Sequence, residues 1–171
     1  MKKIQLIAFV FLFFSGLTQA DIPRFKEVHP HLYRGGQPTE RADYRELKAM
    51  GIRTILNLRE TPFDVAVEQK IAHELDLNFF HIPTSSILAP PKRDMKLALE
   101  IINNPQYQPV FLHCRHGKDR TGMVVGLYRV YFDKWTAERG YEEMVDHGFG
   151  QYYLGLSGFY WTFAKLKDLF S

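Results

Sequence analysis

The sequence predicts an α/β domain with a mostly parallel central sheet flanked by helices. Short β-branched or aromatic runs recur along the chain, and segments with helical periodicity separate them. This alternation is typical of parallel sheets, because a parallel crossover needs a connection about as long as a helix. A Cys-x5-Arg segment also directly follows the last predicted strand. The carboxyl ends of parallel strands are where such sheets usually bind ligands.

The first predicted elements are an extended piece, a helix and a strand. Residues 31–38, HLYRGGQP, are short and end in a Gly-Gly turn and a proline. Thr39 is expected to cap a helix over residues 40–50, which Gly51 would end. Residues 52–58, IRTILNL, are β-branched and apolar, as in a buried strand.

The middle of the chain repeats this order. Residues 65–75 have helical spacing, with an apolar stripe formed by Val67, Ile71 and Leu75. Residues 77–83, LNFFHIP, are predicted to be a second strand that ends at its proline, and residues 84–94 a loop. A helix is expected over residues 95–102.

The last third places a strand before three helices. Residues 109–113, PVFLH, are predicted to be the third strand. Residues 121–132 are apolar almost all round, so that helix should be buried. Thr136 is expected to cap a helix over residues 137–147, and the amphipathic segment 159–170 closes the domain.

The N-terminus is predicted to be an export signal. Lys2 and Lys3 precede an apolar stretch that is too short to span a bilayer, and small residues follow it. We therefore expect a signal peptide over residues 1–20, a single domain over residues 21–171, no membrane span after cleavage, and a periplasmic location. Without the two lysines the formal charge falls from +3 to +1, which argues against nucleic acid as a partner.

Cys114 is the single cysteine of the chain. It can form no intramolecular disulfide, and an exported thiol is a liability unless it is buried and inert or used in chemistry. It opens the segment CRHGKDRTG, which is rich in cations and carries two glycines. This cysteine is therefore the first candidate for a catalytic residue.

The segment after Cys114 has the composition of an anion cradle. Gly117 permits a sharp turn, so backbone N–H groups could converge on one point at a helix start. Arg120 could grip two phosphate oxygens with its planar fork, and Thr121 could donate a hydrogen bond to the sulfur. The predicted phosphate-binding residues are Arg115, His116, Gly117, Lys118, Asp119, Arg120 and Thr121.

A thiolate beneath a bound phosphoryl group would be placed for in-line attack. Cys114 would form a phosphocysteine, which water then hydrolyses. No cofactor or metal is needed, because backbone amides and Arg120 would stabilise the charge. The alternatives are a buried structural cysteine near a basic turn and a phosphate-binding module without turnover.

HCRHGKDRTG resembles the signature loop of cysteine-dependent protein-tyrosine and dual-specificity phosphatases. HLYRGGQP followed by GIRTILNLRE, and the helix after the loop, resemble the plant and fungal atypical dual-specificity group and its bacterial relatives. The resemblance covers about residues 29–148. It implies that Cys114 is the nucleophile, that Arg120 grips the phosphate, and that the backbone from Arg115 to Arg120 forms the cradle.

The general acid has two candidates. Many of these phosphatases carry an aspartate on a separate loop some thirty residues before the cysteine, but no aspartate lies between Asp76 and Asp94 here. Asp119, inside the loop, matches the position of an aspartate in the myotubularin-type enzymes; it could instead form a salt bridge or order Arg120. Asp94 is the second candidate, although it could simply cap a helix before Met95. A substrate with a good leaving group would need neither.

The basic rim suggests the substrate. Arg115, His116 and Lys118 could hold additional phosphates, or could be a solvated rim that favours the thiolate. We expect a multiply phosphorylated small molecule, such as an inositol polyphosphate or phosphoinositide, as the substrate. The alternative is a phosphoprotein, cleaved by a protein-tyrosine or dual-specificity phosphatase.

Overall fold

The computed structural model describes residues 22–170, so the predicted signal peptide lies outside the described residues. The described part has five strands and six helices. The strands are β1 (Lys26–His29), β2 (Leu32–Gly35), β3 (Thr54–Asn57), β4 (Asn78–His81) and β5 (Val110–His113). The helices are α1 (Arg41–Ala49), α2 (Pro62–Glu74), α3 (Lys92–Asn103), α4 (Asp119–Tyr131), α5 (Ala137–Asp146) and α6 (Leu154–Leu166).

The strands form one sheet in the order β1-β2-β5-β3-β4. Strands β2, β5, β3 and β4 are parallel, and only β1 runs antiparallel to its neighbour β2. The predicted mostly parallel α/β class is confirmed. The sequence did not indicate β1, which is short and exposed over its first two residues.

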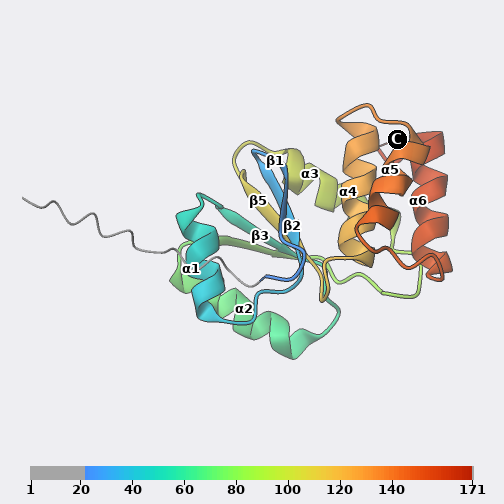
Figure 1. Cartoon of the computed structure of the whole chain (residues 1–171). Coiled ribbons are helices and arrows are strands. Elements are labelled where there is room, and N and C mark those ends of the chain that lie inside the picture. The colour runs from blue at the N-terminus through green and yellow to red at the C-terminus, as the bar shows by residue number, and fades with distance from the viewer. Residues whose placement is uncertain (1–21, 171) are drawn as a thin grey trace, which may run out of the picture.

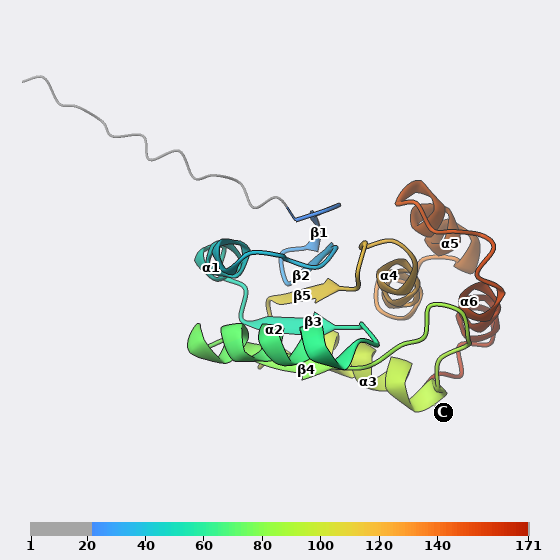
Figure 2. The same ribbon diagram turned by 90° about the horizontal axis from the view of Figure 1, so that it is seen from below.

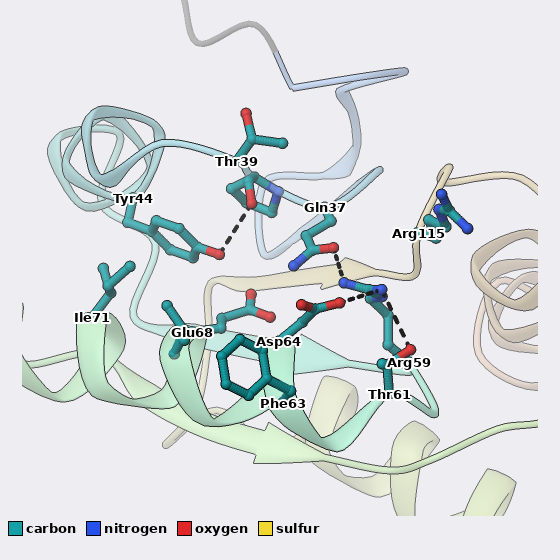
Figure 3. A pocket seen from close by; sticks show the side chains of 12 residues that line it. Gln37, Thr39, Tyr44, Arg59, Thr61, Phe63, Asp64, Glu68, Ile71 and Arg115 are labelled. Carbon is teal, nitrogen blue, oxygen red and sulfur yellow. Dashed lines mark hydrogen bonds and ion pairs between the residues drawn. The ribbon is translucent and has the colours of Figure 1, made fainter.

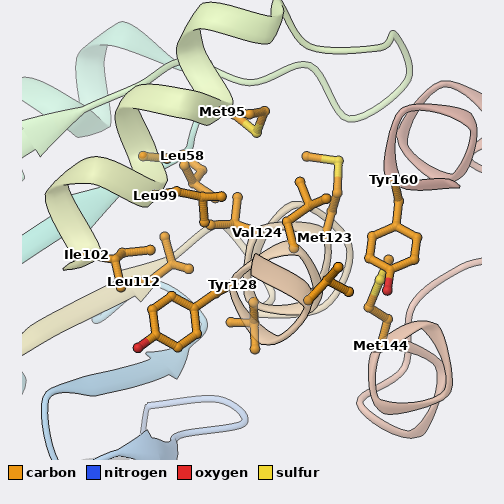
Figure 4. Packing of buried hydrophobic residues seen from close by; sticks show 14 of the residues in the cluster. Leu58, Met95, Leu99, Ile102, Leu112, Met123, Val124, Tyr128, Met144 and Tyr160 are labelled. Atoms are coloured by element: carbon orange, nitrogen blue, oxygen red, sulfur yellow. The ribbon is translucent and has the colours of Figure 1, made fainter. Parts of the chain in front are cut away.

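Helices cover both faces of the sheet (Figures 1 and 2). A small core joins α1 and α2 to one face through Leu47, Ile55, Ala72 and Phe111. The larger core joins the other face to α3 and α4, and then continues outward to α5 and α6. Figure 4 shows Met123 and Val124 of α4 between the sheet and these outer helices. Every strand of the sheet centre is therefore buried on both faces, which explains the continuous apolar runs.

Helix α4 is the central helix, as its all-round apolar sequence predicts. Nine of its residues are buried. Gly126 lies so close to α5 and α6 that an added Cβ would stand 2.8 Å from Met144 Sδ and 2.9 Å from Tyr160 Cε2. The Tyr160 hydroxyl donates to the Ala137 carbonyl at 2.7 Å, which fastens α6 to the start of α5.

One of the two predicted helix caps differs from expectation. The N-cap of α1 is Glu40, not Thr39. Asp43 Oδ2 accepts the backbone N–H groups of both Thr39 and Glu40 at 2.9 Å, so the Asp43 carboxylate reaches back to the helix start as one half of a capping box with Glu40. Thr136 does cap α5, because its side chain accepts the Arg139 N–H at 3.2 Å.

The predicted apolar stripe of α2 was wrong. Val67 is 51% exposed, whereas Val65, Glu68 and Ala72 are the buried residues of this helix. The helix is rotated so that the Glu68 carboxylate faces the protein interior, where it meets polar partners. The periodicity of apolar residues could not reveal a buried acid.

The boundaries of three helices also differ. α2 begins at Pro62 and α3 at Lys92, each three residues earlier than expected, and α6 is Leu154–Leu166 rather than 159–170. Asp94 therefore lies within the first turn of α3, whose N-cap is Pro91, and does not cap it. In the described part of the chain no helix is long and apolar enough to cross a bilayer.

Candidate active site

The loop after β5 lies at the carboxyl edge of the sheet. β5 ends at His113 and α4 begins at Asp119, so five residues make the connection. Gly117 has φ +72°, a left-handed conformation that a glycine adopts without strain. The turn therefore delivers the chain directly to the N-terminus of a buried helix, where N–H groups lack intrahelical partners.

The segment after β2 supports this loop from one side. Gln37 N–H donates to the Arg115 carbonyl at 3.2 Å, and Arg34 Nη2 donates to the Gly117 carbonyl at 3.2 Å. A Cβ on Gly117 would stand 2.5 Å from the Gly35 carbonyl carbon and 2.6 Å from the Gly36 nitrogen. The motifs HLYRGGQP and HCRHGKDRTG are thus packed backbone to backbone, a relation that the sequence did not show.

Cys114 is the residue that leaves β5. It is 2% exposed and borders the larger core. Behind it, the His113 ring lies with Nδ1 3.3 Å from the Cys114 carbonyl oxygen and Nε2 2.8 Å from Glu68 Oε1. Asn57 Nδ2 donates to the other oxygen of Glu68 at 2.5 Å. A buried polar chain from α2 and β3 therefore fixes the backbone at the cysteine, and Glu68 was not anticipated.

Arg120 lies in the first turn of α4. Its Nη1 donates to two backbone carbonyls, Leu58 at 3.4 Å and Thr84 at 3.3 Å. These carbonyls follow β3 and β4, so the guanidinium reaches across the carboxyl edge of the sheet. Thr121, the next residue, is fully buried, and its hydroxyl has no hydrogen-bond partner in the described part of the chain.

The two candidate acids are placed differently. Asp119 Oδ1 accepts the Gly150 N–H at 2.7 Å, which ties the segment between α5 and α6 to the start of α4. Asp94 is half-buried at the start of α3 and pairs with the adjacent Arg93 at 3.3 Å. Asp119 is thus attached to the loop itself, while Asp94 belongs to the helix that follows the 84–91 segment.

The predicted cationic rim is on the surface. Arg115 and His116 are exposed, and Lys118 is half-buried with its stem lying over Gly148. Burial lowers the pKa of His116, and the neighbouring charges of Arg115 and Lys118 lower it further, against the opposing effect of Asp119. His116 is therefore kept largely neutral at pH 7.

Arg34 places a second guanidinium beneath the loop. It is 1% exposed, and its Nε and Nη1 have no hydrogen-bond partner among the described residues. Burial lowers its pKa to about 10, while Glu143 and Cys114 oppose the shift and Arg129 adds to it. Arg34 therefore remains protonated at neutral pH, as a buried positive charge behind Gly117.

A cavity of about 700 Å³ opens beside the loop, between α1 and α2 (Figure 3). Arg115 stands at its edge, and Arg59 crosses it to Gln37 and to Asp64, with Nη2 2.7 Å from the Asp64 carboxylate. Its remaining lining is Pro38, Thr39, Tyr44, Thr61, Phe63, Val67, Glu68 and Ile71. Arg59 and Asp64 form an ion pair inside the cavity, and Phe63, Val67 and Ile71 of α2 make one wall apolar.

The match to a family model shows the class of protein. Residues 16–151 match the family model described as DSP-PTPase phosphatase fused to NAD+ kinase. The chain therefore belongs to this family, within the cysteine-dependent dual-specificity phosphatase group.

Two named relatives illustrate the group. The inositol diphosphatase DSP2 of Oryza sativa is 30% identical over 122 residues, which are 70% of this chain and 59% of that protein. The dual specificity protein phosphatase TpbA of Pseudomonas aeruginosa is 43% identical over 42 residues, 25% of this chain and 19% of that protein. The chain thus spans less than two thirds of the length of these relatives.

Solved structures share the fold. The core catalytic domain of the PP-IP phosphatase SIW14 from S. cerevisiae superposes with a TM-score of 0.73 at 22% identity, over 86% of this chain and 91% of that one. TpbA superposes with a TM-score of 0.70 at 20% identity, over 85% of this chain and 87% of that one.

Proposed function

We propose that this chain is a phosphomonoesterase that works through a phosphocysteine intermediate on a multiply phosphorylated small molecule. One observation carries the chemistry: the single cysteine of the chain is buried at the end of β5, directly before a tight loop that leads into the N-terminus of α4. Backbone N–H groups and the helix dipole at such a place favour an anion and a thiolate.

The proposed reaction has two displacements. Cys114 Sγ attacks phosphorus, so the S–P bond forms while the P–O ester bond breaks and the leaving oxygen takes a proton. Water then attacks phosphorus, the S–P bond breaks, and inorganic phosphate leaves with the thiolate restored. Arg120 and the loop amides would stabilise the equatorial oxygens in both steps, and the unpartnered Thr121 hydroxyl is the donor for the departing sulfur.

Asp119 is the acid we favour, with Asp94 as the alternative. Asp119 is held at the loop by the Gly150 N–H, which leaves its second oxygen free of any hydrogen bond to the described residues. A carboxylate with one fixed oxygen is oriented for proton transfer through the other.

The multiply phosphorylated substrate is supported by the exposed Arg115 and the half-buried Lys118 around the loop, and by the name of the rice relative. A phosphoprotein substrate is the second candidate. The partly apolar 700 Å³ cavity at Arg115 favours it, because that cavity would suit a peptide side chain next to a phosphoresidue.

The test is a substrate panel with purified protein under reductant. It compares p-nitrophenyl phosphate, inositol hexakisphosphate, a phosphoinositide and phosphotyrosine and phosphoserine peptides. We expect phosphate release from p-nitrophenyl phosphate that Cys114→Ser abolishes, and a higher kcat/KM for the inositol compounds than for the peptides. Activity that survives Cys114→Ser would refute the mechanism, and binding without turnover would make the protein a phosphate-binding module.

A further inference from the structure

A second cavity lies at the same edge of the sheet as the Cys114 loop. β1 is antiparallel to β2 and pairs Lys26 with Arg34, so the residues that lead into β1 lie next to the carboxyl end of β2. Helix α5 ends nearby at Asp146. Together they enclose about 400 Å³, lined by Arg24, Phe25, Lys26, Asp146, His147 and Gly148.

This cavity adjoins the Cys114 loop. Arg24 Nη1 donates to the His116 carbonyl at 3.4 Å. From the other side, the Lys118 stem lies over Gly148, where an added Cβ would stand 3.2 Å from Lys118 Cε. Two side chains therefore join the cavity wall to the segment that is proposed to hold the reacting phosphate.

The cavity carries unbalanced positive charge. Among residues 22–170, none of Arg24, Lys26 and Lys118 has a carboxylate within ion-pair distance, and Asp146 is the only one of these residues with an acidic side chain in the lining. Lys118 is half-buried, whereas Arg24 and Lys26 are exposed. Cations around a concave surface that no carboxylate neutralises attract an anion.

The Lys26 ammonium is directed at a histidine. His147 Nδ1 lies 2.8 Å from the Glu143 carbonyl oxygen, which can only accept, so Nδ1 carries the hydrogen. Nε2 then accepts from Lys26 Nζ at 3.1 Å. Burial lowers the pKa of His147 and the charges of Arg34 and Lys26 lower it further, while Glu143 opposes the shift, so a neutral ring is favoured at neutral pH. The Lys26 ammonium can therefore exchange its hydrogen bond to the neutral imidazole for one to a phosphate oxygen, and no ion pair has to break.

We propose that this cavity is a second anion subsite, which binds one phosphate of a multiply phosphorylated substrate through Arg24, Lys26 and Lys118 while another phosphate occupies the Cys114 loop. The proposal rests on the proposed function for the identity of the substrate, but the subsite itself can be measured as binding without turnover. It gives a structural reason for preferring ligands with several phosphates.

The binding experiment uses full-length protein carrying Cys114→Ser and the probe inositol hexakisphosphate, measured by calorimetry. Lys26→Met and Arg24→Met should each weaken binding roughly three- to tenfold, the range expected for one charge-assisted contact near the surface. Lys70→Met and Arg45→Met remove exposed cations from α2 and α1 and are the matched controls, with affinity unchanged. Inorganic phosphate, which brings a single phosphate, should not distinguish Lys26→Met from Lys70→Met.

Turnover supplies the second measurement. With Cys114 present, the ratio of kcat/KM for inositol hexakisphosphate to that for p-nitrophenyl phosphate should fall in Lys26→Met and stay constant in Lys70→Met. Equal affinity of all four variants for the hexakisphosphate would overturn the subsite and leave the phosphatase proposal intact. Conversely, binding that depends on Lys26 and Arg24 in a protein with no phosphatase activity would retain the subsite and refute the enzyme.

Discussion

Gly117 and Gly51 both adopt left-handed backbone conformations, but their surroundings differ. Gly117 has φ +72° and faces the Gly35–Gly36 backbone, whereas Gly51 has φ +88° and no atom within 4 Å of an added Cβ. The conformational penalty of alanine is similar at both sites, and only one site also has a steric clash.

Gly117→Ala should therefore destabilise the protein by at least about 3 kcal/mol and remove most activity, since neither backbone can give way cheaply. Gly51→Ala, the matched control, should cost about 1 kcal/mol and leave kcat unchanged. Urea unfolding and p-nitrophenyl phosphate hydrolysis measure the two effects. Similar losses in both variants would show that the contact between the two glycine motifs is unimportant.

Arg34 acts on the loop through its bond to the Gly117 carbonyl. Arg34→Met should lower kcat roughly ten- to hundredfold, because small displacements of catalytic groups are costly, while KM changes little. Arg34→Lys keeps the charge and should recover part of the activity. Arg129→Met is the comparison: the Arg129 guanidinium is partly buried and pairs with Asp133 and Glu143 away from the loop. This variant should lower the free energy of unfolding and change kcat little.

At the scale of elements, Asp119 links α4 to the segment before α6. Asp119→Asn keeps an oxygen that can accept the Gly150 N–H but removes the acid, whereas Asp119→Ala removes both. If Asp119 is the acid, Asn should slow hydrolysis of alkyl phosphates roughly a hundredfold and affect p-nitrophenyl phosphate, with its good leaving group, far less.

Loss of activity in Asp119→Ala alone would instead assign Asp119 a tethering role and transfer the acid to Asp94. The same pair of variants separates the two roles in stability measurements. Only Asp119→Ala should lower the urea midpoint, because it alone leaves the Gly150 N–H without its partner.

For the whole molecule, histidines set the stability between pH 5 and 7. Burial is the main cause that lowers the pKa of His31, His116 and His147. A histidine in the unfolded chain has a pKa of about 6.5. Below this pH the unfolded state therefore binds more protons than the folded one. Stability should therefore be complete above pH 7 and fall as the pH drops toward 5.

Urea midpoints measured from pH 5 to 7.5 test this dependence. His31→Gln should reduce the slope, because burial and the neighbouring His29 lower the pKa of His31. His31 lies between β1 and β2, where its ring is bonded to the Tyr128 hydroxyl of α4. His73 is exposed on α2 and provides the control substitution His73→Gln, which should leave the slope unchanged. A midpoint that rises toward pH 5 would contradict the assignment.

Local sequence was sufficient to predict the alternation of strands and helices, the buried α4 and the position of Cys114 at a strand end. These features are local, since each depends on residues a few positions apart whose spacing matches a helix or a strand period. The three core strands and the Thr136 cap were predicted for this reason, and the chemistry of Cys-x5-Arg was predicted from a span of seven residues.

The residues that surround the loop became known only from the folded protein. Arg34 bonds to a carbonyl 83 positions away, and Arg24 to one 92 positions away. Glu68 faces inward because its carboxylate contacts His113 and Asn57 there. These contacts rotate α2 away from the orientation that its apolar stripe predicted. Such contacts depend on which faces meet after the strands have paired, and no local periodicity carries that information.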